Sequence, residues 1–244
     1  KVFAATDYEL FYYDTEDNSI HILNKINGLS DVGISTMGYC ESQRKLLVAY
    51  TNSNIDLVDA DGYVSNMSDI KDNKNIIGNK NINHVTINGD LAYVACGFGI
   101  VVFDLKKEEV KDTYYIGNQG DAVNVTDVAF FNGRIYASTD NGIYYASQNA
   151  ANLANYASWS FDNSLIHQHF AYTEMAVFNN RLFLNYNGGY DKDTVFMNDG
   201  SHWGYFEKTN VSEKYELRAY NDKFIITNRY STKVYDTNFN LVQT

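Results

Sequence analysis

A regular spacing of short apolar runs constrains the fold of this chain more than any other feature. Six runs open segments that we expect to form β-strands, and successive starts are separated by 44, 45, 44, 47 and 42 residues. The runs begin at Val2, Leu46, Leu91, Ile135, Leu182 and Phe224. A period of about 40 to 50 residues indicates that each repeat is one supersecondary unit.

Each repeat contains more than one strand signal. Every run is followed by a second apolar segment that ends on Asp, Asn or Ser, residues that favour tight turns. Glycines at 97–99 and at 140–142 supply the positive φ of hairpin turns. Upstream strand candidates cover residues 34–39, 82–87, 125–131, 172–178 and 215–220, and a shorter fourth strand completes the unit. We therefore predict an all-β fold, a β-propeller of four-stranded antiparallel blades with a period of about 44 residues.

A helical solenoid is the alternative for such a period. No window shows sustained apolar spacing at i, i+3 and i+4, and Asn-Gly turns interrupt every candidate, which excludes the solenoid. We interpret the helix-friendly stretch 150–157 as a long connection between blades. About six blades of an expected seven are visible, and the first lacks its inner strand. We expect residues 1–244 to be a single β-propeller domain and an incomplete fragment of a larger multidomain protein.

Composition excludes several classes of function. The hydrophobic content of 45% is sufficient for a packed core, and the net charge of −11 disfavours binding to nucleic acid or anionic bilayers. No run approaches the roughly 18 apolar residues of a membrane span. Secretion cannot be read from the N-terminus, because Lys1 directly precedes a strand-like run. The chain contains no proline, for which we have no explanation.

Motifs that carry chemistry are weak or incomplete. Cys40 and Cys96 are too few and too far apart for a disulfide scaffold or a zinc site, and we expect two buried free thiols. Residues 59–62 begin like a calcium loop, but the glycine comes too early, so we interpret them as a hairpin turn. Residues 138–145 resemble the Asp-box turn of sialidase-like propellers, which is structural. His167 and His169 would share one face of a strand, and two imidazoles alone make an incomplete metal site.

Polar residues on the inner strands are the remaining candidates. Inner strands line the central channel of a propeller, and four titratable residues fall within them: His84, Asp127, Glu174 and Glu216. We interpret these residues as hydrogen-bonded between blades or solvated, and not as a site. No pair among the 30 acidic residues can be nominated for glycosidase chemistry, and no nucleophile elbow, P-loop or dinucleotide fingerprint is present. We therefore predict no enzymatic activity, no cofactor, and binding residues that are unknown.

Several segments resemble a known family. They are 27–35 (NGLSDVGIS), 54–57 (NIDL), 68–71 (SDIK), 77–80 (IGNK), 92–102 (AYVACGFGIVV) and 108–117 (EEVKDTYYIG). They resemble the opening blades of PorZ-type proteins of the type IX secretion system of Bacteroidetes. The similarity covers nearly the whole chain, is strongest from Asn27 to Asn155, and weakens beyond Phe161. The missing prolines depart from the family pattern.

The resemblance implies a function. It implies two propellers followed by a C-terminal β-sandwich signal domain, of which this chain is most of the first propeller. It also implies a cell-surface location, associated with the outer membrane, in an attachment complex that joins secreted cargo to an anionic lipopolysaccharide. The expected partners are other subunits of that complex and this lipopolysaccharide. The segment Asn27 to Ser30 equally fits the periplasmic ligand-sensing propeller of hybrid two-component regulators, which is the alternative.

Overall fold

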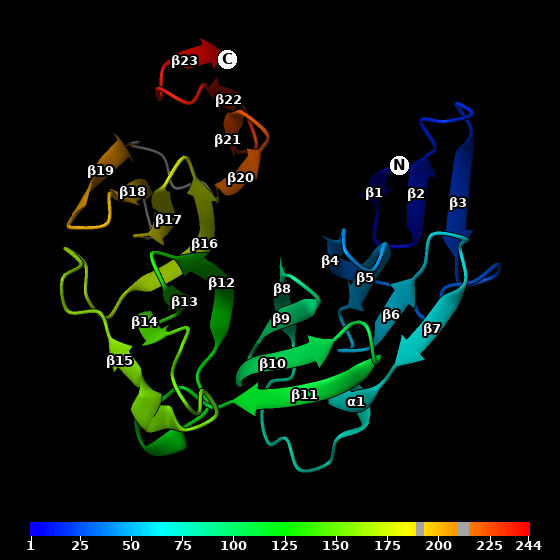
Figure 1. Ribbon diagram of the computed structural model, residues 1–244, viewed down its shortest axis with the longest axis horizontal. Coiled ribbons are helices and arrows are strands. Elements are labelled where there is room, and N and C mark those ends of the chain that lie inside the picture. The colour runs from blue at the N-terminus through cyan, green and yellow to red at the C-terminus, as the bar shows by residue number, and fades with distance from the viewer. Residues whose placement is uncertain (189–192, 209–214) are drawn as a thin grey trace. The chain divides into compact units, whose positions relative to one another are not determined.

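Six antiparallel sheets, each one blade of a β-propeller, make up the described part of the chain (Figure 1). The computed structural model describes residues 1–188, 193–208 and 215–244. The chain divides into two units, residues 1–113 and 114–244, and each unit is described by itself. Five sheets have four strands and the first has three, so the predicted all-β propeller of four-stranded blades is confirmed. The seventh blade stays a prediction.

The first unit contains three sheets. The first sheet consists of β1 (Val2–Ala5), β2 (Glu9–Tyr13) and β3 (Ile20–Asn24). The second consists of β4 (Ile34–Cys40), β5 (Lys45–Tyr50), β6 (Ile55–Val58) and β7 (Val64–Met67), followed by the single helical turn α1 (Asp69–Asp72). The third consists of β8 (Ile82–Asn88), β9 (Leu91–Cys96), β10 (Gly99–Asp104) and β11 (Glu109–Tyr114).

The second unit contains the other three sheets and two short 3₁₀ turns, η1 (Asn118–Gly120) and η2 (Tyr156–Ser158). The fourth sheet consists of β12 (Val125–Phe131), β13 (Arg134–Thr139), β14 (Gly142–Ser147) and β15 (Trp159–Phe161). The fifth consists of β16 (Ala171–Phe178), β17 (Arg181–Asn187), β18 (Thr194–Asn198) and β19 (Trp203–Lys208). The sixth consists of β20 (Glu216–Tyr220), β21 (Lys223–Thr227), β22 (Thr232–Tyr235) and β23 (Leu241–Gln243).

The periodic apolar runs are the second strands of the blades. In the second to fifth sheets this strand is buried on both faces, so its sequence is largely apolar without alternation. In the sixth sheet, β21 alternates between buried and half-buried positions. In the first sheet the run forms the edge strand β1, so the expected lack of an inner strand is confirmed.

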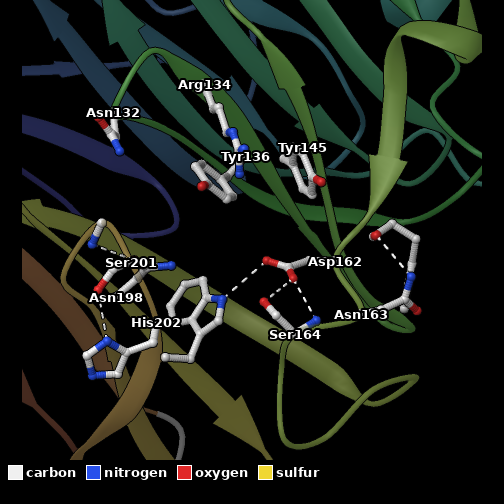
Figure 2. Close-up of a pocket in the computed structure, with 13 residues that line it drawn as sticks. Asn132, Arg134, Tyr136, Tyr145, Asp162, Asn163, Ser164, Asn198, Ser201 and His202 are labelled. Carbon is white, nitrogen blue, oxygen red and sulfur yellow. Dashed lines mark hydrogen bonds between the residues drawn. The ribbon is translucent and has the colours of Figure 1, made fainter.

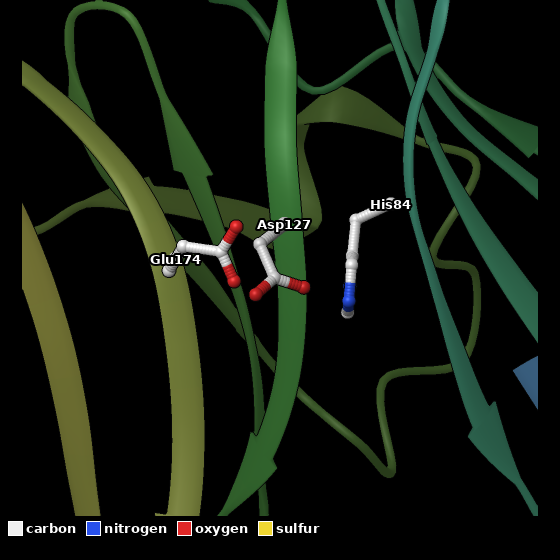
Figure 3. A group of neighbouring side chains, drawn as sticks. All are labelled: His84, Asp127 and Glu174. Carbon is white, nitrogen blue, oxygen red and sulfur yellow. The ribbon is translucent and has the colours of Figure 1, made fainter. Parts of the chain in front are cut away.

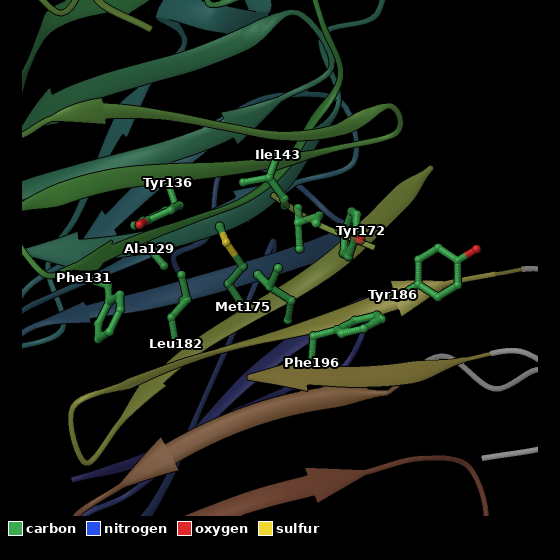
Figure 4. Packing of buried hydrophobic residues seen from close by; sticks show 11 residues of the cluster. Ala129, Phe131, Tyr136, Ile143, Tyr172, Met175, Leu182, Tyr186 and Phe196 are labelled. Atoms are coloured by element: carbon green, nitrogen blue, oxygen red, sulfur yellow. The ribbon is translucent and has the colours of Figure 1, made fainter. Parts of the chain in front are cut away.

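Alternate side chains of β17, the second strand of the fifth sheet, pack against different blades. Leu182 and Leu184 of β17 lie in one apolar cluster with Tyr136 and Ile143 of the fourth sheet (Figure 4). Phe183, between them in the chain, lies in another cluster, and its ring centroid is 4.1 Å from that of Phe224 in the sixth sheet. The second unit is therefore held together by two apolar layers, one on each face of the fifth sheet.

A bulge recurs near the start of the inner strands. The pairing register shifts by one residue between Ile82 and His84, between Val125 and Asp127, and between Tyr172 and Glu174. The extra residue in a β-bulge changes the direction in which the side chain of the following residue points. His84, Asp127 and Glu174 each occupy that following position, four residues before the end of their strand.

A buried carboxylate ties the second blade to the segment that enters it. Asp56 of β6 has no exposed surface and accepts hydrogen bonds from the Tyr50 hydroxyl at 2.6 Å, the Ser30 backbone N–H at 2.7 Å and the Asn66 amide at 2.8 Å. Ser30 lies in the 27–35 segment and Asp56 in the 54–57 segment, two of the stretches that carry the family resemblance. In this structure the hydrogen bond between Ser30 and Asp56 joins the two stretches.

The interpretation of residues 150–157 as a connection between blades is wrong. This segment lies inside the fourth sheet, between β14 and β15. After it, β15 returns to pair with β14, and Phe161 lies opposite Tyr144. The Trp159 indole N–H donates to the Leu153 carbonyl oxygen at 2.9 Å and anchors the long loop against its own blade.

Candidate functional site

A cavity of about 440 Å³ lies in the second unit, between the fourth and fifth sheets (Figure 2). Its volume is in the usual range for small-molecule sites, about 300–1,000 Å³. Six side chains define what we call the Asp162 pocket: Arg134, Tyr136, Tyr145, Phe161, Asp162 and Trp203. The rest of the lining comes from Asn132, Asn163, Ser164, Asn198, Gly200, Ser201 and His202.

Strand pairing places the aromatic and cationic side chains together. Arg134 and Tyr136 are two residues apart on β13 and therefore point to the same face. Tyr145 of β14 is the direct cross-strand partner of Tyr136, and their ring centroids are 5.9 Å apart. The Arg134 guanidinium lies 4.5 Å from the centroid of the Tyr145 ring, within the range of a cation–π contact.

The carboxylate comes from the residue that follows β15. Asp162 is 7% exposed and accepts hydrogen bonds from the backbone N–H and the hydroxyl of Ser164, the former at 2.9 Å. The indole N–H of Trp203, the first residue of β19, donates to its other oxygen at 3.2 Å. An ionised carboxylate has about four acceptor sites, so three protein donors leave one for a ligand.

Arg134 provides the positive charge in the pocket. It is exposed, and its guanidinium forms no ion pair with any residue in the ranges 1–188, 193–208 and 215–244. The neighbouring Tyr136 hydroxyl raises the pKa of Arg134, and burial raises the pKa of Tyr136. At neutral pH the pocket therefore offers a fixed cation, a neutral phenol and a hydrogen-bonded carboxylate.

The inner-strand candidates do not form part of this pocket. His84 lies on β8 in the first unit, whereas Asp127, Glu174 and Glu216 lie on β12, β16 and β20 in the second. Carboxylate oxygens of Asp127 and Glu174 come within 4.8 Å of each other (Figure 3).

These carboxylates bond to neighbouring blades. Asp127 accepts from the Met175 N–H at 2.7 Å, and Glu174 pairs with Arg218 of β20 at 3.2 Å. Glu216 is exposed. Asp127 and Glu174 are therefore hydrogen-bonded between blades, and Glu216 is solvated, which are the two alternatives that we expected from the sequence.

The two closely spaced histidines lie in a loop, so the expectation of a shared strand face is wrong. His167 and His169 precede β16, and each ring stacks on a different aromatic side chain. The ring centroid of His167 is 4.3 Å from that of Tyr186, and that of His169 is 4.7 Å from that of Phe161. Aromatic packing in the loop separates the two imidazoles.

The two turn motifs have structural roles, as predicted. The Asp59 carboxylate accepts from the backbone N–H groups of Asp61 and Tyr63, both at 2.9 Å, and closes the turn between β6 and β7. In the Asp-box-like segment, the Thr139 hydroxyl donates to the Gly142 carbonyl oxygen at 2.8 Å.

Cys40 and Cys96 are both buried free thiols, which confirms the prediction. Burial raises the pKa of the Cys96 thiol well above its usual range, so Cys96 stays protonated at neutral pH. Among the helices that the structure describes, none is long and apolar enough to cross a membrane.

No residue of the Asp162 pocket was predicted as a site residue, and Asp162 and Trp203 were the hardest to find. They are 41 residues apart and come from a loop and a fourth strand. One signal was available in the sequence: Trp159 and Trp203, the two tryptophans of the chain, are one repeat of 44 residues apart. Each is the first residue of a fourth strand.

The antiparallel blades define the class of this chain as a β-propeller. Residues 2–160 match the family model described as the N-terminal β-propeller domain of PorZ, of the type IX secretion system. The chain therefore belongs to the PorZ N-terminal propeller family. No curated protein matches it.

Solved structures show the same fold. PorZ of Porphyromonas gingivalis, described as an essential bacterial surface component of the type IX secretion system, superposes with a TM-score of 0.82 at 24% identity, covering 99% of this chain and 31% of that one. The propeller domain of Cps50 (Swd1) from Myceliophteria thermophila gives 0.64 at 12% identity, covering 97% and 80%. A chain of the mitotic checkpoint complex gives 0.63 at 10%, covering 97% and 73%. This chain thus spans about a third of the PorZ chain that it resembles.

Proposed function

We propose that this propeller is a non-enzymatic binding and scaffold component of the type IX secretion system at the cell surface, where it assists the attachment of cargo proteins to anionic lipopolysaccharide. The match of residues 2–160 to the PorZ family carries the proposal. The P. gingivalis relative is described as a surface component of this system. The other subunits of an attachment complex would be its partners.

The pocket supports binding without turnover. Glycoside hydrolysis needs two carboxyl groups about 5–9.5 Å apart on either side of the scissile bond. In the described lining of the Asp162 pocket, Asp162 is the one carboxylate, and three protein donors hold it. A binding site on a scaffold that does not need to move fits this arrangement.

We also propose that residues 1–244 form one propeller domain of a larger protein. Coverage of 31% of the PorZ chain supports this proposal. The full gene would then continue into a second propeller and a sandwich-type signal domain. A transmembrane helix and a kinase module downstream would instead support the sensor alternative and contradict the proposal.

Purified anionic lipopolysaccharide tests the proposed function. It is titrated into the full-length protein and into this chain while soluble sugar and peptide products are monitored. We expect saturable binding by the full-length protein and no products. Absence of binding by the full-length protein contradicts the attachment role, and release of products contradicts the non-enzymatic role.

A further inference from the structure

The Asp162 pocket contains a cation, Arg134, although the net charge of the chain is strongly negative. With a net charge of −11, most of the surface repels an anionic polysaccharide, so capture of such a ligand requires a local cation. Arg134 is such a cation, because it forms no ion pair with a carboxylate of the described residues and interacts with the Asp162 charge only at longer range. Its five N–H donors suit a planar carboxylate or a phosphate.

The rest of the lining suits a pyranose ring. The half-buried rings of Tyr145, Phe161 and Trp203 offer aromatic surface, and Figure 2 shows the Tyr136 and Tyr145 rings next to Arg134. Sugar hydroxyl groups both donate and accept hydrogen bonds. One hydroxyl can donate to the remaining acceptor site of Asp162, while another accepts from a pocket amide such as that of Asn163.

We propose that the Asp162 pocket binds one sugar ring that carries a carboxylate or phosphate group, with the anionic group at Arg134 and a ring hydroxyl at Asp162. This inference rests on the proposed function and assigns it a site and a ligand class. Asp162 is compatible with an anionic ligand because three protein donors already stabilise its charge.

Free monosaccharides test the assignment directly. D-glucuronic acid, D-glucose 6-phosphate and neutral D-glucose are titrated into this chain, and binding is followed by saturation-transfer NMR and by tryptophan fluorescence. We expect at least one acidic sugar to bind about 10-fold more tightly than glucose, because a charged hydrogen bond to Arg134 is added. The Trp203→Phe variant should lose the fluorescence change, while Trp159 remains.

Two variants and a matched control isolate the charge. Arg134→Gln should reduce the affinity for the acidic sugar to that for glucose, and Asp162→Asn should weaken both. Arg181 is the first residue of β17, as Arg134 is of β13, and it lies outside the pocket lining. Arg181→Gln should therefore leave both affinities unchanged. No binding of any of the three sugars, or equal loss in Arg134→Gln and Arg181→Gln, would overturn the assignment.

The same variants separate the site from the function. If full-length wild-type protein and full-length Arg134→Gln bind anionic lipopolysaccharide equally, the pocket assignment fails and the proposed function stands. If the acidic sugar binds in the pocket but the full-length protein does not bind the lipopolysaccharide, the proposed function fails and the pocket assignment stands.

Discussion

Replacement of Asp56 by alanine tests how the second blade is held together. The substitution removes the acceptor for three donors: the Tyr50 hydroxyl, the Ser30 N–H and the Asn66 amide. A buried donor left without a partner costs about 1–3 kcal/mol. The Tyr50 hydroxyl is fully buried, so its loss of a partner carries the full free-energy penalty. Asn66 is exposed, so water can replace its lost hydrogen bond in part.

The resulting magnitude is measurable. We expect Asp56→Ala to lower the free energy of unfolding by about 3–5 kcal/mol, which for a chain of this size lowers Tm by roughly 6–20 °C. Tyr50→Phe removes one donor and leaves the carboxylate in place, so a smaller loss of about 1–2 kcal/mol is expected.

Urea unfolding followed by far-ultraviolet circular dichroism measures both losses. Asp59→Ala is the matched control, because Asp59 also accepts two short hydrogen bonds but lies in a hairpin turn where water can reach the freed N–H groups. The control should lose about 1 kcal/mol. An Asp56→Ala variant no less stable than Asp59→Ala would refute the role of Asp56 as the connection between the blade and the 27–35 segment.

Three further predictions concern stability. Burial opposes ionisation of Asp31, but hydrogen bonds from Lys71, Asn52 and Lys25 outweigh this effect and hold the pKa of Asp31 well below its usual range. The ionised Asp31 therefore stabilises the fold above the unfolded pKa of about 3.9, and this stabilisation is lost as the pH falls. Urea midpoints measured between pH 7 and pH 2 should show the stability of Asp31→Asn approaching that of the wild type on acidification, and a constant difference would be inconsistent with this linkage. Phe183→Ala should lower the free energy of unfolding by about 3–5 kcal/mol, because the ring is fully buried between the fifth and sixth sheets. Val177→Ala, at a 37% exposed position, should lower it much less in the same urea measurement. Equal losses would argue against packing at Phe183. Gly142 has a φ of +104°, and a Cβ there would lie 2.5 Å from the Phe161 ring. Gly89 has a φ of +60°, and a Cβ there would meet open space. Gly142→Ala should therefore lower Tm more than Gly89→Ala, and the opposite order would contradict the close approach of Gly142 to Phe161.

The blades could be predicted from the sequence because the second strands of the second to fifth sheets are buried on both faces. A run such as 91–96 is apolar at every position, and the turn residues on either side mark its ends. Trp159–Phe161 has only three residues, follows a loop rather than a tight turn, and belongs to its sheet only through pairing with β14. No local pattern marks such a strand, which explains the wrong interpretation of residues 150–157.

The candidate site was less predictable for a related reason. The tertiary fold brings Arg134, Asp162 and Trp203 together from β13, the residue after β15 and β19, and no short sequence motif contains any two of them. The inner-strand carboxylates, by contrast, occupy one position of the repeat, and the repeat alone placed Asp127 and Glu174 correctly. Their hydrogen bonds to the next blade show that a repeated polar position here serves assembly of the blades.

A crystal structure of this chain soaked with D-glucuronic acid is the most direct measurement of ligand binding by the propeller. We expect electron density for one sugar ring in the Asp162 pocket, with its carboxylate at the Arg134 guanidinium and a hydroxyl within hydrogen-bond distance of Asp162. Density for the sugar at another place, with the pocket unchanged, would contradict the assignment of the pocket as the glycan-binding site.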